Sequence, residues 1–305
     1  MRIAIVGSGG VGGYFGGRLA AGGDEVFFVA RGPHLAALRE RGLRLLSAAG
    51  DLHLPRVMAT DDTRSIGPVD VVFFTVKLYD TTSAIEMLPP LVGPGTVVVP
   101  FQNGVDAVDS LTAAIGPRHV AGGTTYIVAS IAEPGVIRHT ALGRLIFGPL
   151  QPGQLPVLEK LNERCRAAGI DATLSQEVLS EIWMKFARLT VFSGMTSLTR
   201  CPIGAVVSDP DLWSMFQRAV HESVAVARGR GVTLPQSMED DVLKAVAAMP
   251  PESKSSMLGD LERGKPLELP WLSGAIVRIG REVGVPTPTH DFIAAALKPH
   301  VNGRV

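Results

Sequence analysis

Hydrophobic and polar positions follow one pattern in the first half of the chain and another in the second. In the first half, short apolar runs alternate with helix-like stretches, and the clearest runs are 2–7, 25–30, 69–76 and 96–101. Apolar runs of this length, bounded by glycine or polar residues, are typical of buried parallel strands. Because a helix-like stretch follows each run, the pattern predicts a mostly parallel sheet with helices on both faces.

Residues 121–150 are rich in β-forming side chains and contain turn signals. A helix over about 155–168 and a short strand near 172–174 are expected to complete the first domain. Beyond about Ser175 the apolar spacing predicts helices only, over 177–192, 211–230, 237–248, 254–263, 271–283 and 291–298.

The predicted fold class is therefore α/β. An N-terminal Rossmann-type doubly wound parallel sheet is expected in residues 1–175, and a C-terminal all-helical domain is expected in residues 176–305. In two-domain proteins of this kind, ligands usually bind in a cleft between the domains.

Composition narrows the partners and the compartment. Lys and Arg total 29 and Asp and Glu total 29, so the net charge is zero and no nucleic-acid partner is expected. The two cysteines, Cys165 and Cys201, are too few for a disulfide framework or a zinc motif, so no metal is expected and a reducing compartment is favoured. The apolar runs are too short to span a membrane, and the first residues already form a predicted strand. We expect a cytoplasmic protein that binds a small molecule, and a homodimer is compatible with the sequence.

A glycine-rich hexad joins the first strand to the first helix. Its residues, Gly7, Ser8, Gly9, Gly10, Val11 and Gly12, match G-x-G-x-x-G. Glycine is needed for the tight turn, for backbone approach to a pyrophosphate and for close helix–strand packing. The helix amino terminus then offers free N–H groups to the phosphates. The position of the hexad favours dinucleotide binding over a purely structural turn.

Two basic residues indicate which dinucleotide is bound. Arg31 follows the second strand, where an acidic residue would favour NAD. A guanidinium can pair with the 2′-phosphate of NADPH, so NADPH is expected, unless Arg31 is only a solvated loop residue. Lys77 follows the strand 69–76 and can support the adenosine phosphate or approach the ribose, although a surface lysine is an equally good interpretation.

Lys185 occupies the middle of an otherwise apolar helical stripe, Val178–Ile182–Lys185–Leu189–Phe192. Most lysines in such a stripe extend to water. If the helix instead lines a cleft, desolvation lowers the pKa of the ammonium and makes it a better proton donor.

Other polar residues are candidates with a structural alternative each. Asn103 follows the strand 96–101, and its carboxamide is expected near the nicotinamide, although Asn-Gly is also a common turn. Glu268 precedes Pro270 and is a helix cap, a ligand for a substrate hydroxyl, or a charge that keeps Lys185 protonated. Ser255 and Ser256 begin a helix and either cap it or offer hydroxyls to a substrate carboxylate.

Taken together, the ordered motifs resemble the ketopantoate reductase family over nearly the whole chain. The pieces are the glycine hexad with Arg31, Val76-Lys77, Gln102-Asn103-Gly104, Trp183-Met184-Lys185-Phe186, the stretch from Ser255 through Asp260 to Glu268, and Gly284-Val285-Pro286-Thr287-Pro288. The resemblance implies that Lys185 is the general acid and that Asn103 positions cofactor and substrate. It also implies that Ser256 and Glu268 hold the substrate and that Arg31 and Lys77 recognise NADPH. We count Glu268 with Lys185 as a catalytic residue and, with Asn103, as a residue close to the cofactor.

The chain departs from the family pattern after the catalytic lysine. Leu189 and Ser193 stand where the best-characterised members carry asparagines, and Ser193 remains a candidate substrate-binding residue. Exchanging an amide for an aliphatic group removes hydrogen bonds and changes substrate specificity.

Four functional hypotheses follow. The leading one is NADPH-dependent reduction of a 2-oxo acid, with 2-dehydropantoate to pantoate, a step of pantothenate biosynthesis, as the expected reaction. The second is reduction of a different, more apolar 2-oxo acid or ketone. The third is a dehydrogenase of another two-domain class, acting on 3-hydroxy acids or polyol phosphates. The fourth is a non-catalytic NADPH sensor, against which Lys185, Asn103 and Glu268 argue.

Overall fold

The chain forms two compact units. The first unit comprises Met1–Asn103 and Ala107–Val178, and the second comprises Gly104–Asp106 and the residues from Leu179 onward. The computed structural model describes residues 1–304, so the last residue of the predicted helical domain lies outside the described part. None of the helices within residues 1–304 has the length and apolarity that crossing a membrane requires.

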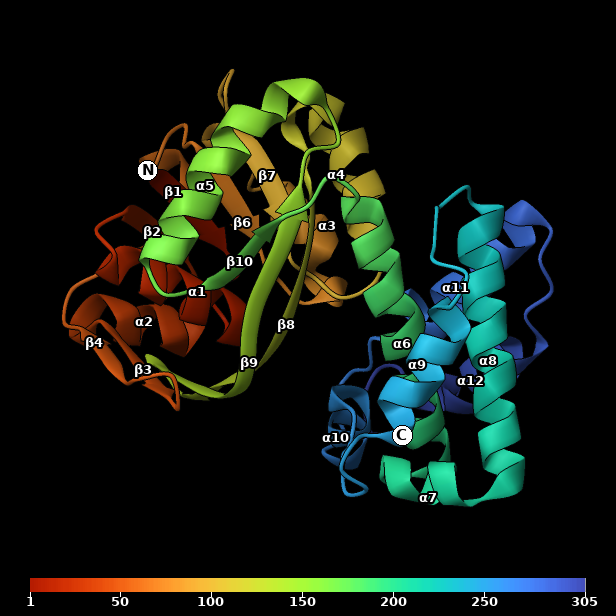
Figure 1. Cartoon of the computed structure of the whole chain (residues 1–305). Helices are drawn as coiled ribbons and strands as arrows, with labels where there is room; N and C mark the ends of the chain where they lie inside the picture. The colour runs from red at the N-terminus through yellow and green to blue at the C-terminus, as the bar shows by residue number, and fades with distance from the viewer. Residues whose placement is uncertain (305) are drawn as a thin grey trace. The chain divides into compact units, whose positions relative to one another are not determined.

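A five-stranded parallel sheet forms one layer of the first unit (Figure 1). Its strand order is β5-β2-β1-β6-β7, and every neighbouring pair is parallel. The bounds are β1 (Arg2–Val6), β2 (Glu25–Val29), β5 (Met58–Thr60), β6 (Val71–Phe74) and β7 (Val97–Pro100). Central strands of such a sheet are buried on both faces, which explains their continuous apolar runs. The predicted parallel sheet is confirmed, and only β5 at its edge had no sequence signal.

A second, mixed sheet completes the first unit, and the sequence did not predict it as a separate layer. Its order is β10-β9-β3-β4, and β8 pairs with β9 as an antiparallel hairpin. The strands are β3 (Leu43–Ser47), β4 (Leu52–Leu54), β8 (Gly122–Glu133), β9 (Val136–Gly148) and β10 (Asp171–Leu174). The predicted β-rich stretch 121–150 and the strand near 172–174 lie in this sheet, and β3 pairs with β9, a strand that begins at Val136.

Helix α1 (Gly10–Ala21) packs against both sheets, and its glycines make this possible. A Cβ on Gly16 would lie 2.8 Å from Ile5 and Phe28 of the parallel sheet. A Cβ on Gly17 would lie 3.0 Å from Leu43 and Leu45 of the mixed sheet. The helix therefore approaches two layers at distances that side chains would prevent. The other helices of this unit are α2 (Gly32–Arg41), α3 (Thr81–Ile85), α4 (Asp106–Ile115) and α5 (Leu155–Ala167).

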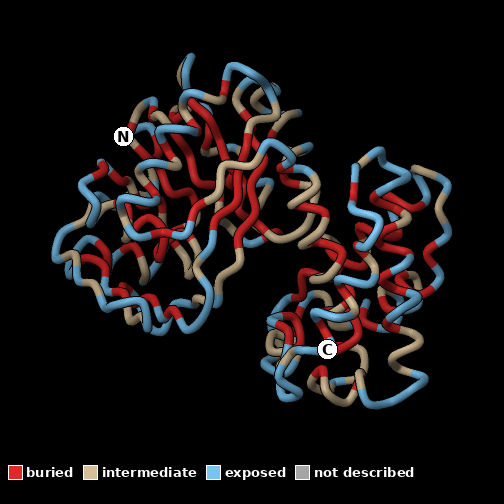
Figure 2. The backbone as a smooth tube through the Cα atoms, viewed as in Figure 1, coloured by how far each residue is buried: buried red, intermediate tan, exposed pale blue. Residues whose placement is uncertain are grey.

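The second unit is helical, as predicted (Figure 1). Buried segments run through its helices and through the strands of the first unit (Figure 2). α6 continues beyond the predicted end at Phe192, and α7 was not predicted. The helices are α6 (Val178–Thr199), α7 (Ile203–Ser208), α8 (Pro210–Gly229), α9 (Met238–Ala247), α10 (Ser256–Glu262), α11 (Ser273–Val283) and α12 (Pro288–Leu297).

Candidate functional site

The three glycines that match the G-x-G-x-x-G pattern, Gly7, Gly9 and Gly12, have three different surroundings. Gly7 has a φ of 96°, and a Cβ there would lie 2.6 Å from the Val76 amide nitrogen. A Cβ on Gly12 would lie 2.5 Å from the Gly7 carbonyl oxygen and from Thr75 Oγ1. A Cβ on Gly9 would meet no atom within 4 Å. Gly7 and Gly12 are thus required by the fold, whereas Gly9 faces open space where a ligand can approach the backbone.

The start of α1 offers backbone donors and no side-chain cap. Gly9 is the N-cap residue, and no side chain accepts from the first-turn amides. The amides of Gly10, Val11 and Gly12 belong to the first turn, where an α-helix provides no internal acceptor. Together with the helix dipole they form a candidate site for a phosphate group.

Ser8, predicted to bind the cofactor, points inward instead. Its hydroxyl donates to the carbonyl oxygens of Ile5 at 3.2 Å and Val29 at 3.1 Å, and its amide also donates to Val29 O at 3.1 Å. The residue is 3% exposed. The Ser8 side chain therefore stabilises the turn and is not directed at a ligand.

Arg31 and Lys77 follow β2 and β6, the two strands that flank β1, at the carboxyl edge of the parallel sheet. Arg31 is the N-cap residue of α2, and its Nη2 lies 2.7 Å from Oδ1 of Asp80. Lys77 precedes a short 3₁₀ helix, Leu78–Asp80, and is exposed. The strands β1, β2 and β6 are parallel and in register, so both cations lie on the edge to which the glycine turn belongs.

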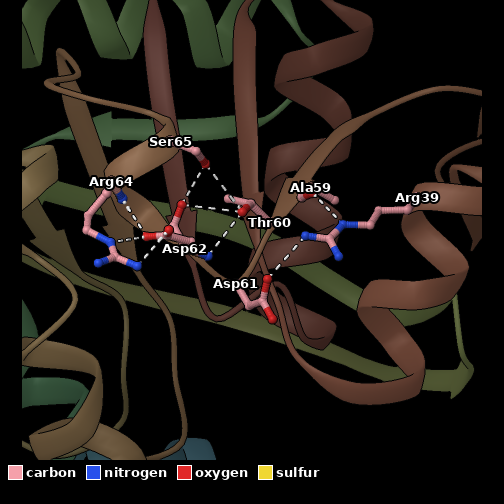
Figure 3. A network of polar contacts seen from close by, with 7 residues as sticks. All are labelled: Arg39, Ala59, Thr60, Asp61, Asp62, Arg64 and Ser65. Atoms are coloured by element: carbon pink, nitrogen blue, oxygen red, sulfur yellow. Dashed lines mark hydrogen bonds and ion pairs between the residues drawn. The ribbon is translucent and has the colours of Figure 1, made fainter.

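The loop after β5 anchors α2 at this edge (Figure 3). Arg39 of α2 donates from Nε to the Ala59 carbonyl oxygen at 3.1 Å, and its Nη2 lies 3.1 Å from Oδ1 of Asp61. The Ala30 amide donates to the Thr60 carbonyl oxygen at 3.1 Å, directly before Arg31. The helix that begins at Arg31 is therefore fixed to the sheet through its later turns.

Gln102, which entered the sequence analysis only as part of a motif, lies at the carboxyl edge of the parallel sheet. Its Nε2 donates to the Val76 carbonyl oxygen and to Thr81 Oγ1, both at 2.9 Å, which joins the end of β7 to the end of β6. Its Oε1 is buried and has no hydrogen-bond partner, an arrangement that ordinarily costs free energy. Asn103, the next residue, is partly exposed.

Lys185 lies in α6, and part of its surface remains accessible. Burial lowers the pKa of its ammonium to about 8, the nearby Glu268 carboxylate opposes this shift, and the Arg188 guanidinium adds to it. Arg188 was not singled out in the sequence analysis. The sequence shows that Arg188 is an i,i+3 neighbour of Lys185, but it does not show that Arg188 lowers the pKa of Lys185.

Glu268 is only 8% exposed, and its carboxylate raises the pKa of Lys185. It stands at the N-cap position of a 3₁₀ turn, Leu269–Trp271, but its side chain makes no capping hydrogen bond. Of the three interpretations given above, the capping carboxylate is therefore wrong. Glu268 instead raises the pKa of Lys185, although the two residues are far apart in the sequence.

The three serines singled out in the second unit, Ser193, Ser255 and Ser256, have different surroundings. Ser255 caps α10 by accepting from the Leu258 amide at 3.0 Å, and it shares a 2.8 Å hydrogen bond with Thr196 of α6. Ser256 begins α10 and is exposed. Ser193 on α6 is 1% exposed, and its Oγ has no hydrogen-bond partner. The cap is thus Ser255, whereas the Ser256 side chain is exposed and the Ser193 hydroxyl is buried without a protein partner.

Family models match most of the chain. One described as "Ketopantoate reductase PanE/ApbA" matches residues 3–152, and one described as "Ketopantoate reductase PanE/ApbA C terminal" matches residues 177–301. Among curated relatives, a 2-dehydropantoate 2-reductase of Mesorhizobium japonicum is 33% identical, covering 98% of this chain and 97% of that protein.

Solved structures share the complete architecture. A PanE/ApbA family ketopantoate reductase from Ralstonia eutropha superposes with a TM-score of 0.89 at 32% identity and covers 98% of each chain. A D-mandelate dehydrogenase, solved with NADH and anilino(oxo)acetate, superposes with a TM-score of 0.89 at 21% identity and also covers 98% of each chain. The second likeness concerns the fold alone.

Proposed function

The chain belongs to the ketopantoate reductase family, and from this premise we propose that it uses NADPH to reduce 2-dehydropantoate, or a close 2-oxo acid, to the 2-hydroxy acid. The enzyme is an oxidoreductase that acts on a keto group, as its family does. The observation that carries the proposal is Lys185, a partly buried lysine whose pKa is lowered to about 8 beside the Glu268 carboxylate.

The first unit fits a nicotinamide dinucleotide. The open space at Gly9 and the uncapped first turn of α1 suit the pyrophosphate, and the unpaired Gln102 Oε1 suits a donor group of the cofactor. Arg31 supports NADPH over NADH, because an exposed guanidinium pairs with a 2′-phosphate and gains little from a hydroxyl. Lys77 adds a second cation at the same edge, and we place Asn103 beside the nicotinamide. When bound, the cofactor supplies the hydride.

Lys185 would act as the general acid. Reduction turns the keto oxygen into an alkoxide, and an ammonium aimed at that oxygen stabilises the charge as it develops. A pKa of about 8 leaves the lysine largely protonated at neutral pH, yet lets it release its proton more readily than an ordinary lysine does. Glu268 favours the protonated form, so it prepares the donor for the next turnover. The proton passes from Lys185 Nζ to the carbonyl oxygen and is replaced from solvent.

The hydroxyls of Ser256 and Ser193 are proposed to hold the substrate. Serine hydroxyls donate to carboxylates, and neither of these two hydroxyls caps a helix. Leu189 is partly buried and packs against the core of the second unit, so it contributes an aliphatic surface where the family pattern has an amide. This favours a 2-oxo acid with a branched apolar side chain alongside 2-dehydropantoate.

The two cysteines support the proposed compartment. Cys165 and Cys201 are both free, and burial raises the pKa of Cys165 to about 12, which keeps it unreactive. Two unpaired thiols support the proposal that the enzyme works in a reducing compartment such as the cytoplasm.

The test is a screen of NADPH oxidation over 2-dehydropantoate and branched 2-oxo acids, with NADH as the comparison cofactor. We expect turnover with members of the 2-oxo acid class and a preference for NADPH. Activity confined to 3-oxo acids or polyol phosphates would reject the proposal. NADPH binding without turnover of any keto substrate would favour a sensor.

A further inference from the structure

His34 connects two segments of the first unit that are distant in sequence. It lies in the first turn of α2 and is half-buried. Its Nε2 is 2.9 Å from the carbonyl oxygen of Ser8 in the glycine turn, and the Gly135 amide nitrogen is 3.1 Å from its Nδ1. Gly135 belongs to the turn between β8 and β9.

The two partners determine the protonation of the ring. A backbone amide can only donate, so Nδ1 must accept from Gly135 and carry no proton. A carbonyl oxygen can only accept, so Nε2 carries the proton that is donated to Ser8. The neutral ring therefore satisfies both contacts. Burial favours the same form because it lowers the pKa of His34 below its usual 6.5, against the opposing effect of the Ser8 bond.

His34 completes the hydrogen bonding of Ser8. The amide and hydroxyl of Ser8 bind Val29 and Ile5, and its carbonyl oxygen binds His34. The Ser8–Gly9 peptide immediately precedes the first turn of α1. The direction of the amides proposed to bind the pyrophosphate therefore depends on the contact to His34.

The same residue fixes the start of α2. Arg39 holds the later part of this helix to Ala59 and Asp61 (Figure 3). His34 holds its beginning to Ser8. Arg31, the cation proposed to bind the 2′-phosphate, stands one turn before His34 at the N-cap. The imidazole thus lies between the two anion sites of the first unit.

We propose that His34 is a positioning residue that sets the spacing between the pyrophosphate site at the glycine turn and the 2′-phosphate site at Arg31. The inference rests on the proposed function, because it requires that NADPH binds at these two sites. A ligand that carries both phosphate groups gains affinity from correct spacing, since its second contact is intramolecular. A ligand that carries only one phosphate does not gain in this way.

Two polar substitutions separate the contacts of His34. His34→Asn keeps an acceptor near Nδ1 for Gly135 but has no donor that reaches Ser8. His34→Gln places an amide donor near Nε2, so it should restore the Ser8 contact. His53→Asn, on the exposed face of β4, is the matched control.

The experiment uses the full-length wild type and the three variants. NADPH binding is measured by its nicotinamide fluorescence, and adenosine 2′-phosphate binding is measured by its displacement of NADPH. We expect His34→Asn to weaken NADPH by about tenfold or more, because it leaves the buried Ser8 carbonyl without its donor. Adenosine 2′-phosphate should weaken by less than about threefold, since it contacts only one site. His34→Gln should stay within about threefold of the wild type, and kcat at saturating NADPH should change by less than about twofold in every variant.

The outcomes separate the two proposals. A wild type that does not bind NADPH overturns the proposed function, and the inference with it. A wild type that binds NADPH while His34→Asn binds it equally well overturns only the inference. Equal losses for NADPH and adenosine 2′-phosphate, or equal losses in His34→Asn and His34→Gln, assign a merely structural role to His34 and also overturn it.

Discussion

The guanidinium of Arg31 lies 2.7 Å from the carboxylate of Asp80, and this ion pair joins the ends of β2 and β6. The Arg31 side chain is 75% exposed, whereas that of Asp80 is 27% exposed. A phosphate can therefore approach the open side of the guanidinium while Asp80 holds its other side. The cation proposed to select NADPH is thus already oriented, and it also has a competing anion.

Arg31→Ala should remove the preference for NADPH. The 2′-phosphate loses a charge-assisted partner, so NADPH affinity should fall by about tenfold or more, whereas NADH affinity should change little. Dissociation constants for both cofactors, measured by nicotinamide fluorescence, test this expectation. Equal losses for the two cofactors would show that Arg31 does not contact the 2′-phosphate.

Asp80→Asn should strengthen NADPH binding. The amide keeps a similar shape but no longer competes with the 2′-phosphate for Arg31, so affinity should rise by about two- to fivefold at low ionic strength. The gain should shrink in high salt, because both charges are near the surface. NADH serves as the control ligand. Weaker NADPH binding would instead mean that Asp80 is needed to orient Arg31.

Lys185→Ala should separate catalysis from cofactor binding. Loss of a general acid lowers turnover by about a hundredfold or more, while NADPH affinity should be retained because the glycine turn is untouched. Lys185→Arg is the matched control, since it keeps the charge but donates a proton poorly at neutral pH. If Lys185→Ala turns over like the wild type, Lys185 is not the proton donor.

Much of the fold was predictable because its elements are local. The buried strands β1, β2, β6 and β7 are recognisable as continuous apolar runs. Most helices of the second unit are recognisable by the helical spacing of their apolar residues. β4 and β5 have three residues each, too few to show a period. The β-rich stretch 121–150 was recognisable, but its pairing with β3 was not, because no local pattern encodes the parallel pairing of β3 with β9.

In the candidate site, too, local features could be predicted from the sequence and long-range contacts could not. The glycine hexad is recognisable because three constraints fall within six residues, and the structure gives Gly7 and Gly12 the crowded surroundings that such a turn demands. The inward direction of Ser8 and the unpaired Oε1 of Gln102 depend on atoms brought in from other strands. The pKa of Lys185 likewise depends on Glu268, which comes close to it only when the chain folds.

The pH dependence of reduction should follow Lys185. A lysine is protonated below its pKa, and the reaction needs the protonated form, so kcat/KM should fall as pH rises past about 8. Two variants should move this alkaline limb in opposite directions. Glu268→Gln removes the charge that raises the pKa of Lys185 and should shift the limb to lower pH.

Arg188→Gln removes a charge that lowers the pKa of Lys185 and should shift the limb to higher pH. Profiles of kcat/KM for both variants, recorded at saturating NADPH, provide the measurement. Shifts of the same sign in the two variants would contradict the electrostatic assignment, because a carboxylate and a guanidinium cannot act alike on one ammonium.

Gly9→Ala should weaken NADPH binding and Gly12→Ala should lower stability, although each adds one methyl group to the same hexad. The methyl of Gly9→Ala meets no atom within 4 Å, so stability should be nearly unchanged while the group blocks backbone approach to the pyrophosphate, and NADPH affinity should fall by about tenfold or more. The methyl of Gly12→Ala would lie 2.5 Å from the Gly7 carbonyl oxygen and from Thr75 Oγ1, so overpacking should cost about 1–3 kcal/mol of the free energy of unfolding. Urea denaturation and NADPH titration of both variants measure the two effects. A Gly9→Ala variant that is stable and still binds NADPH like the wild type would remove the glycine turn from the cofactor site.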